Sequence, residues 1–217
     1  MKPSWRYEQK LWRQGYSLVA GVDEVGRGAW AGPVVAAAVV IERAQLPHLR
    51  KLSWWNLVND SKLVAPSVRQ RIFSALGSEL VWALGVVNNK AIDQIGLAAA
   101  NRRAVHLAVS NLKIRPDYVL ADYVAKLGQT LADAPAWTVV DGDSSIFSIA
   151  LASIVAKVSR DRLMASYDKK YPGYGFAAHK GYGTAEHRQA LGQLGISPIH
   201  RRSYRPVQER LSVHLWR

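Results

Sequence analysis

The stretch Gly21-Val-Asp-Glu-Val-Gly-Arg-Gly28 places two acidic residues directly after the apolar run Ser17-Leu-Val-Ala20. An apolar run of this kind predicts a buried strand. Successive side chains of a regular strand point to opposite faces, so Asp23 and Glu24 can share one cavity only if the strand ends there. We therefore expect the strand to end at Asp23 and the chain to turn both carboxylates toward one site.

The residues after this acidic pair suit an anionic ligand. The glycines at 26 and 28 let backbone N–H groups approach a ligand closely, and Arg27 supplies a guanidinium fork for phosphate. The stretch thus has the outline of a site for metal ions and phosphate. A surface turn with an arginine–carboxylate pair is the alternative, and this stretch alone leaves both open.

The charge balance favours the first interpretation. The chain has 29 Lys and Arg against 16 Asp and Glu, a formal net charge of +13, which indicates a polyanionic partner. Acidic residues beside apolar runs of such a basic protein indicate divalent metal ions working on nucleic acid, because the metal removes the repulsion between carboxylate and phosphate. A basic surface that only confers solubility is the alternative.

Length and composition exclude several classes. A chain of 217 residues is long enough for one well-buried domain. The absence of cysteine excludes disulfide frameworks and thiolate zinc sites. No segment approaches about 18 consecutive apolar residues, and the N-terminus lacks the apolar core of a signal peptide. We expect a cytoplasmic protein with no membrane partner.

The apolar pattern along the chain predicts five strands with helices between them. Three early strands can follow one another directly and two later ones are separated by helical segments, which indicates an α/β fold with a mixed five-stranded sheet flanked by helices. The predicted strands cover residues 17–23, 33–41, 80–87, 117–121 and 136–140, and the predicted helices cover 67–79, 91–111 as one or two helices, and most of the chain after 143, except the Gly/Tyr-rich stretch 171–184.

Two further carboxylates follow predicted strands. Asp122 ends the fourth strand, and Asp143 lies after the fifth at the start of a helix. Ligands of open α/β sheets gather at the carboxyl ends of strands, so both would converge with Asp23 and Glu24 if the first, fourth and fifth strands are parallel. Separately, Asp122 could be a turn residue and Asp143 a helix cap. Their joint placement favours a site, and four carboxylates suffice for two magnesium ions.

Six motifs in this order resemble the ribonuclease HII family, the bacterial type 2 ribonucleases H. The resemblance runs from about Tyr16 to Val207. Its motifs are GVDEVGRGAWAGPVVAAAVV at 21–40, NDSK at 59–62, AIDQIGLAAANRRAV at 91–105, GDSSIFSIALASIVAKVSRDRLM at 142–164, YPGYGFAAHKGYGTAEH at 171–187 and SPIHRRSYRPV at 197–207.

The resemblance implies a ribonuclease H-like fold with a helical C-terminal part. The whole chain, 1–217, would be one catalytic domain, with about 184–217 a C-terminal helical extension; the polar and aromatic residues 1–16 are expected to form a short helix or an N-terminal arm. The implied activity is hydrolysis of the RNA strand of RNA/DNA hybrids, including cleavage 5′ of a single ribonucleotide in duplex DNA. It would use two divalent ions, Mg²⁺ or Mn²⁺, leave 5′-phosphate and 3′-hydroxyl ends, and act as a monomer in ribonucleotide removal and RNA primer processing.

The resemblance also assigns site residues. The family's metal-binding carboxylates fall on Asp23, Glu24, Asp122 and Asp143. Its glycine-arginine-glycine element falls on Gly26, Arg27 and Gly28, its ribonucleotide-sensing tyrosine on Tyr182, and Lys62 belongs to the DSK motif. The packing alternative for Tyr182 is an aromatic cluster with Tyr171, Tyr174 and Phe176.

Some positions depart from the family pattern. Ala29 and the bulky Trp30 follow the glycine-arginine-glycine element where proline is common, Tyr123 stands in the usual place of glycine, and Asp141 replaces a lysine before the GD pair. Because Asp122 has no glycine behind it, Asp117 and Asp133 remain competing candidates for the third carboxylate.

Other residues are candidates for contacts with the duplex or with a partner. Lysines 62, 157 and 180 are candidate phosphate contacts, and His200-Arg-Arg202 with Arg205 would grip the duplex backbone. We expect structural or phosphate-contact roles for His179 and His187. The tail 211–217 could dock on a replication clamp or pack on the core.

Two other functions remain open for these residues. A related metal nuclease of the same fold class would use the same carboxylates but ignore the 2′-hydroxyl. A non-catalytic nucleic-acid-binding module would explain the charge but not four strand-end carboxylates. The short segment of about 16 residues before the first strand favours type 2 over type 3 ribonucleases H, which carry a substantial N-terminal domain.

Overall fold

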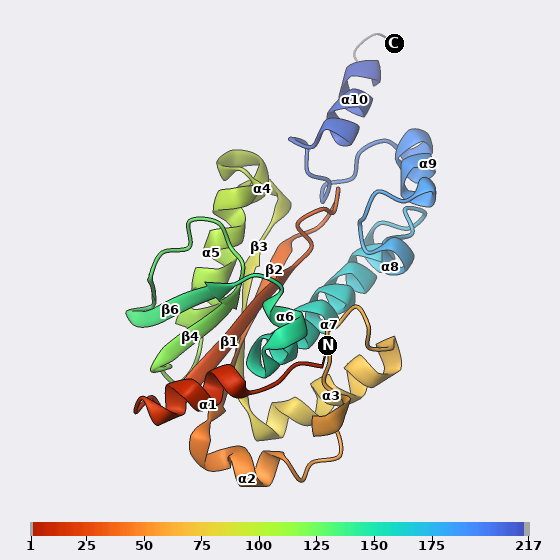
Figure 1. The fold of residues 1–217 in the computed structure, drawn as a ribbon. Helices are drawn as coiled ribbons and strands as arrows, with labels where there is room; N and C mark the ends of the chain where they lie inside the picture. The colour runs from red at the N-terminus through yellow and green to blue at the C-terminus, as the bar shows by residue number, and fades with distance from the viewer. Residues whose placement is uncertain (1, 215–217) are drawn as a thin grey trace.

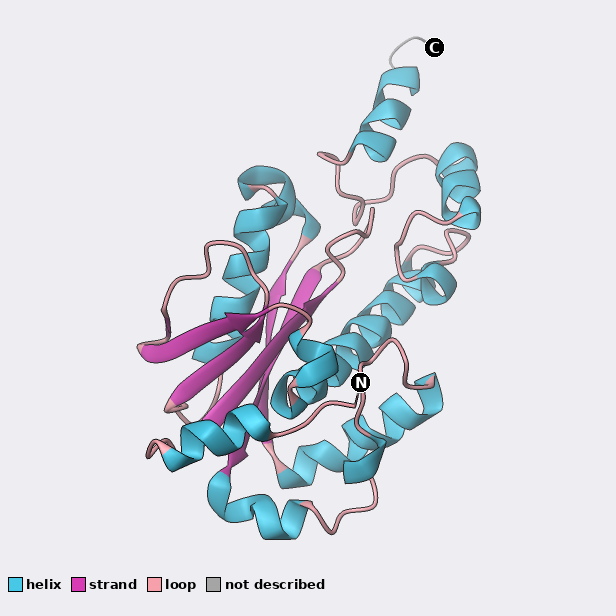
Figure 2. Cartoon of the chain, in the orientation of Figure 1, coloured by secondary structure: helices cyan, strands magenta, loops and turns pink. Residues whose placement is uncertain are grey.

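The computed structural model describes residues 2–214, and its centre is a twisted mixed sheet with helices on both faces (Figures 1 and 2). The strand order is β3-β2-β1-β4-β6-β5. The strands are β1 (Leu18–Val25), β2 (Val34–Glu42), β3 (Val81–Val87), β4 (Tyr118–Asp122), β5 (Thr130–Leu131) and β6 (Ala134–Val139).

The pairing confirms the mixed sheet. Strand β1 is antiparallel to β2 and parallel to β4, and β4 is parallel to β6, so the first, fourth and fifth predicted strands share one direction. The short strand β5, inside the predicted loop, makes an additional hairpin with β6. Its turn residues Ala132 and Asp133 have φ of +47° and +62°, the backbone that a two-residue hairpin turn requires.

Helices occupy the predicted segments 67–79 and 91–111 and much of the chain after 143, and a further short helix, Phe176–His179, lies inside the stretch 171–184 that was expected to interrupt them. The break in the 91–111 segment falls at Gly96, where φ is +77° and the chain changes direction. Within residues 2–214 no helix has the length and apolar character needed to cross a membrane. The α-helices are α1 (Arg6–Arg13), α2 (Leu46–Leu49), α3 (Pro66–Glu79), α4 (Asn89–Ile95), α5 (Leu97–Ser110), α6 (Gly142–Ser145), α7 (Phe147–Lys170), α8 (Phe176–His179), α9 (Ala185–Leu194) and α10 (Arg205–His214), and short 3₁₀ turns span η1 (Arg43–Gln45) and η2 (Trp55–Leu57).

Two hydrophobic clusters cover the two faces of the sheet. Alternate residues of β1 enter different clusters: Val19 packs with α7 and α3, whereas Ala20 and Val22 pack with α5. Strand β2 is buried on both faces from Val34 to Ile41, which explains its uninterrupted apolar sequence. The odd-numbered side chains of β1 therefore face α7 and the even-numbered ones face α5.

The expected end of the first strand at Asp23 is wrong. Strand β1 keeps its pairing with β2 as far as Val25 opposite Val35, so Asp23 and Glu24 point to opposite faces. They still reach one site, because the pairing of β1 with β4 ends at Val22 opposite Ala121. Beyond that point one edge of β1 has no neighbouring strand, and side chains from both faces border the same open space.

Two strand glycines let helices approach the sheet closely. A Cβ atom on Gly21 would lie 2.1 Å from the Ser148 carbonyl carbon in α7, and one on Gly85 of β3 would lie 1.9 Å from the Ala104 carbonyl oxygen in α5. Both obstacles are helix backbone, which cannot move aside as a flexible side chain can. These glycines therefore set the distance between the sheet and each covering helix.

We predict that Gly21→Ala lowers the free energy of unfolding by about 1–3 kcal/mol, because the added methyl group overpacks the contact with α7. Urea unfolding followed by circular dichroism measures the loss. The matched control is Gly77→Ala in α3, where an added Cβ has nothing within 4 Å. Alanine should there stabilise the helix by up to about 1 kcal/mol. Equal effects of both substitutions would contradict the close-approach argument.

Candidate active site

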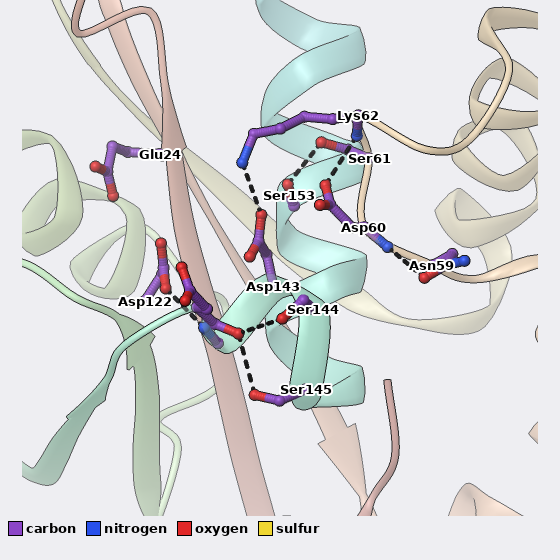
Figure 3. A network of polar contacts seen from close by, with 12 residues as sticks. Glu24, Asn59, Asp60, Ser61, Lys62, Asp122, Asp143, Ser144, Ser145 and Ser153 are labelled. Carbon is purple, nitrogen blue, oxygen red and sulfur yellow. Dashed lines mark hydrogen bonds and ion pairs between the residues drawn. The ribbon is translucent and has the colours of Figure 1, made fainter. Parts of the chain in front are cut away.

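A cavity of about 380 Å³ opens where β1 extends beyond β4, and the four acidic residues singled out from the sequence border it together. Figure 3 shows Glu24, Asp122 and Asp143 around this space, with Lys62 reaching toward Asp143 from the opposite side. The lining residues are Asp23, Glu24, Val25, Arg27, Ser61, Lys62, Asp122, Asp143, Ser153, Lys157 and Tyr182.

Asp23 and Asp143 are both buried, each with 6% of its surface exposed, and Asp23 lies on the face of β1 that is covered by α7. Burial raises the pKa of Asp23 well above the ordinary value, and the negative charges of Glu24 and Asp122 raise it further, while a hydrogen bond with Ser153 in α7 opposes the shift. An ionised Asp23 is therefore destabilised in the protein alone. A bound cation would remove this penalty.

Glu24 lies on the other face of β1. Burial raises its pKa, and Arg27 and Asn101 of α5 act in the opposite direction. Arg27 donates from Nη1 to Oε1 at 3.2 Å, but Oε2 is buried with no hydrogen-bond partner. An oxygen left in this state costs free energy unless something else satisfies it.

Asp122 ends β4 and Asp143 lies in α6, which follows the neighbouring parallel strand β6, and the two are linked through the backbone. Asp122 Oδ1 accepts a 2.8 Å hydrogen bond from the Gly142 N–H at the start of α6, which fixes the segment carrying Asp143. Asp143 Oδ2 accepts from Lys62 Nζ at 3.1 Å. The competing candidates lie elsewhere: Asp117 accepts from the N–H groups of Ser17 and Leu18 at the start of β1, and Asp133 pairs with Arg115.

This donor set fits hard divalent cations. All four groups are carboxylates, the ligands that Mg²⁺ and Mn²⁺ prefer, and Glu24 Oε2 lacks a partner. Within the described residues, no three acidic or histidine side chains are gathered closely enough to enclose an ion. Instead Lys62 and Arg27, with 79% and 55% of their side chains exposed, each pair with one carboxylate. The positive charges of Lys62 and Arg27 are at the ends of flexible, exposed side chains, which can move away from the carboxylates.

Two buried arginines, which the sequence analysis did not recognise as structural, hold the glycine-arginine-glycine loop. Arg201 donates to the carbonyl oxygens of Gly26 at 2.6 Å, Arg27 at 2.8 Å and Gly32 at 3.0 Å. Arg160 donates to the carbonyls of Pro33, Lys180 and Ala31. A Cβ on Gly26 would strike Arg160 Nε at 2.1 Å.

The expectation that the run at 200–202 grips the duplex backbone is wrong for its first two residues. His200 is 1% and Arg201 0% exposed, so neither reaches a phosphate. Burial lowers the pKa of Arg201 and lowers that of Arg160 to about 10. In place of water, backbone carbonyl dipoles solvate the charges of these two arginines. Arg202 and Arg205 are exposed on the surface.

Tyr182 lies at the opposite wall of the pocket, on a loop joined to Ala29 by an antiparallel bridge. Its ring faces the guanidinium of Arg160 at 5.4 Å. The aromatic packing considered from the sequence involves other rings, since Tyr174 stacks on Phe176 at 5.1 Å. No ring contact joins Tyr182 to that stack in the described part of the chain.

The remaining candidates divide into pocket and scaffold residues. Lys157 lines the pocket and pairs with Asp161 at 2.9 Å, whereas Lys180 bonds to the Ala177 carbonyl beside the pocket. Ser61 and Ser153, joined by a buried 2.8 Å hydrogen bond, connect the DSK segment to α7. The serine pair was missed because isolated serines carry no pattern.

The positions that depart from the family pattern leave the carboxylates in place. Asp141 adopts a left-handed conformation, and its carbonyl, not its carboxylate, accepts from Ser144 and Ser145. Tyr123 is 53% exposed at the rim. Trp30 packs against His187.

Comparison with known proteins identifies the family. The model of the ribonuclease HII family matches residues 20–207. A ribonuclease HII of Dehalococcoides mccartyi is 47% identical over 212 residues, which cover 97% of each chain. The structure of ribonuclease H2 from Pyrococcus horikoshii OT3 superposes with a TM-score of 0.76 at 26% identity, covering 92% of this chain and all of that one.

Two more distant structures share the fold. A ribonuclease HII of Archaeoglobus fulgidus, solved in complex with PCNA, gives a TM-score of 0.71 at 21% identity and covers 87% of this chain and 95% of that one. A Bst ribonuclease HIII, solved in complex with Mn²⁺, gives 0.64 at 18% identity, covering 93% and 71%. With the family model matching most of its length, this chain belongs to the ribonuclease HII family and is a type 2 ribonuclease H endonuclease.

Proposed function

We propose that the chain hydrolyses the RNA strand of RNA/DNA hybrids and cuts on the 5′ side of a single ribonucleotide in duplex DNA. The observation that carries this proposal is the meeting of four carboxylates, the glycine-arginine-glycine loop and Tyr182 at one pocket. The products would be 5′-phosphate and 3′-hydroxyl ends, suited to ribonucleotide removal and RNA primer processing. We further propose that the chain works as a cytoplasmic monomer and one catalytic domain.

Two divalent cations, Mg²⁺ or Mn²⁺, would be held by Asp23, Glu24, Asp122 and Asp143. Bound there, the cations would supply an activated water for in-line attack and stabilise the leaving 3′-oxygen. The raised pKa of three of these carboxylates and the unpartnered Oε2 of Glu24 support this assignment. Binding of the divalent cations would release Lys62 from Asp143 and Arg27 from Glu24.

The protein's own groups then bind and orient the duplex. Lys62 and Arg27, once released, are placed at the pocket mouth to contact phosphates. Gly28 has nothing within 4 Å of the position of a Cβ atom, so a ribose can approach the backbone here. We assign contact with the 2′-hydroxyl to the backbone of residues 26–28, because this hydroxyl distinguishes RNA from DNA at a given position.

The C-terminal tail is a second point of proposal. Residues 215–217 lie outside the described part of the chain, and the side chains of 211–214 are not described. The PCNA complex of the distant relative leads us to propose clamp docking by 211–217. Deleting this segment should abolish clamp binding in a pull-down without changing the unfolding midpoint, and unchanged binding would assign the tail to packing.

We predict that Asp23→Asn lowers cleavage by on the order of 100-fold or more, while raising the melting temperature measured without divalent cations. A raised pKa means that the folded protein loses stability as the pH rises through that pKa. The stabilising effect of asparagine should therefore be larger at pH 8 than at pH 5. Calorimetry at both pH values measures it.

The control for this substitution is Asp133→Asn, at an 86% exposed carboxylate far from the pocket. It should leave both cleavage and melting temperature unchanged. An Asp23→Asn protein with parental turnover, or one that melts lower at both pH values, would show that Asp23 supports the fold and not the reaction.

We predict that Tyr182→Ala lowers cleavage at a single embedded ribonucleotide at least about tenfold, equivalent to roughly 1.4 kcal/mol of transition-state stabilisation. The protein should stay folded and bind duplex DNA as the parent does, because Tyr182 lines the pocket and lies outside the aromatic stack. Tyr171→Ala, outside the pocket lining, is the matched control. Equal cleavage by the Tyr182→Ala protein and the parent would remove Tyr182 from the site.

A further inference from the structure

Three buried histidine rings lie directly behind the Tyr182 loop. His179 ends α8, His187 lies in the first turn of α9 and His200 follows α9, and they are 9%, 0% and 1% exposed. The rings of His179 and His187 stack with centroids 4.3 Å apart, and the ring of Phe176 contacts all three. None of these rings borders the pocket, so the proposed reaction does not use them directly.

Backbone groups determine which nitrogen of His200 and of His187 carries hydrogen. The N–H of Ser197 donates to His200 Nδ1 at 2.9 Å, and a hydrogen on Nδ1 would oppose this N–H, so that nitrogen is bare; the Ser197 hydroxyl, 2.7 Å away, then donates to it as well. At the other end, His187 Nδ1 lies 2.9 Å from the carbonyl oxygen of Tyr182. A carbonyl oxygen can only accept, so His187 Nδ1 must carry a hydrogen.

The contact between the two rings then has one direction. His187 Nε2 lies 3.0 Å from His200 Nε2. His200, bare at Nδ1, carries its hydrogen on Nε2 and donates it to His187 Nε2. A second proton on His187 would be on Nε2 and would face the hydrogen that His200 donates. A second proton on His200 would be on Nδ1 and would face the Ser197 N–H. Both rings are therefore neutral.

The surroundings favour this neutral state. Trp30 and Phe176 pack on His187, and Tyr174 and Phe176 pack on His200. Burial lowers the pKa of each ring to about 4, assisted by the neighbouring histidines. His179 is ordered in the same way, accepting from the Gly181 N–H at 3.1 Å and donating to the Tyr174 carbonyl at 2.7 Å.

The end of this chain of hydrogen bonds is the backbone of the pocket residue. The Tyr182 carbonyl also accepts from the Thr184 N–H at 2.8 Å, and the Tyr182 N–H donates to the backbone carbonyl oxygen of His179 at 3.0 Å. The Tyr182 peptide is thus held on both sides by residues outside the pocket. Its neighbours Lys180 and Gly181 have left-handed φ of +55° and +81°, so the loop needs such support to keep the ring in place.

We propose that His187 and His200 are positioning residues: a neutral, proton-ordered pair that runs from the Ser197 N–H to the Tyr182 carbonyl and holds the Tyr182 ring against the scissile ribonucleotide. The proposal rests on the proposed function of Tyr182. It assigns to this pair no contact with substrate and no proton transfer during the reaction.

The first test compares two amides at position 187. Asparagine places its nitrogen where Nδ1 was and can still donate to the Tyr182 carbonyl, whereas glutamine reaches toward His200 and cannot. We expect His187→Gln to lower kcat for a duplex with one ribonucleotide at least about fivefold with little change in KM. His187→Asn keeps the bond to the Tyr182 carbonyl and loses only the contact with His200, so its loss of activity should be clearly smaller than that of His187→Gln. Equal losses in both variants would overturn the proposal.

A double-mutant cycle with Tyr182→Ala distinguishes positioning from general support of the fold. If His187 acts through Tyr182, His187→Gln should cause no further loss once Tyr182 is alanine. The same fold-loss in both backgrounds would overturn the proposal. A Tyr182→Ala protein that cleaves like the parent would contradict the proposed role of Tyr182 instead.

Nitrogen-15 NMR of the imidazole rings in the unaltered protein tests the proton order independently of folding defects in any variant. At pH 7 we expect hydrogen on Nδ1 of His187 and on Nε2 of His200 and His179. Hydrogen on Nε2 of His187, or a doubly protonated ring of His187 or His200, would overturn the proposal whatever the activity measurements show.

Discussion

Helix α7 lies against strand β1 with no side chain between them at Gly21, and the active site depends on this contact. The helix carries Ser153 and Lys157 to the pocket and begins just after Asp143, while the strand carries Asp23 and Glu24. A wider separation would move one pair of carboxylates away from the other. The small residues of β2 let helices approach both faces of the sheet in the same way. Residues with small side chains or none therefore set the distance between the sheet and its covering helices.

Although the chain as a whole is basic, the pocket itself is acidic and two arginines close to it are buried. The pocket contains three carboxylates whose pKa values are raised, those of Asp23, Glu24 and Asp122. Arg160 and Arg201 lie buried nearby and are solvated mainly by carbonyl oxygens. The buried arginines reach no phosphate, and their donors are occupied by backbone carbonyls that fix the loop beside the pocket. The acidic pocket itself is a place where a bound cation would relieve the repulsion between carboxylates.

Apolar periodicity was sufficient to predict the five longer strands and most of the helices, because these depend on which side chains are buried locally; the short strand β5 was not predicted, and the parallel direction of β1, β4 and β6 was only a condition of the predicted site. The end of β1 was predicted wrongly at Asp23, since the pairing with β2 that carries the strand to Val25 depends on residues far along the chain. For the same reason Arg201 resembled a phosphate contact: its bond to the Gly26 carbonyl joins residues 175 positions apart. Local sequence reports charge, whereas burial of that charge is decided by tertiary contacts. The carboxylates were found because each follows an apolar run, a pattern that single serines and histidines do not have.

The hydrogen bonds from Arg201 to the loop around Gly26 have a consequence for protein synthesis. The residues that define the site begin near the N-terminus, but the guanidinium that fixes their loop is made only after about nine-tenths of the chain. A nascent chain on the ribosome, surrounded by messenger and ribosomal RNA, therefore holds its acidic residues without the completed pocket. Order of synthesis thus delays the fixing of this loop until residue 201 has been made, and a chain cut short before residue 201 would lack the guanidinium that holds it.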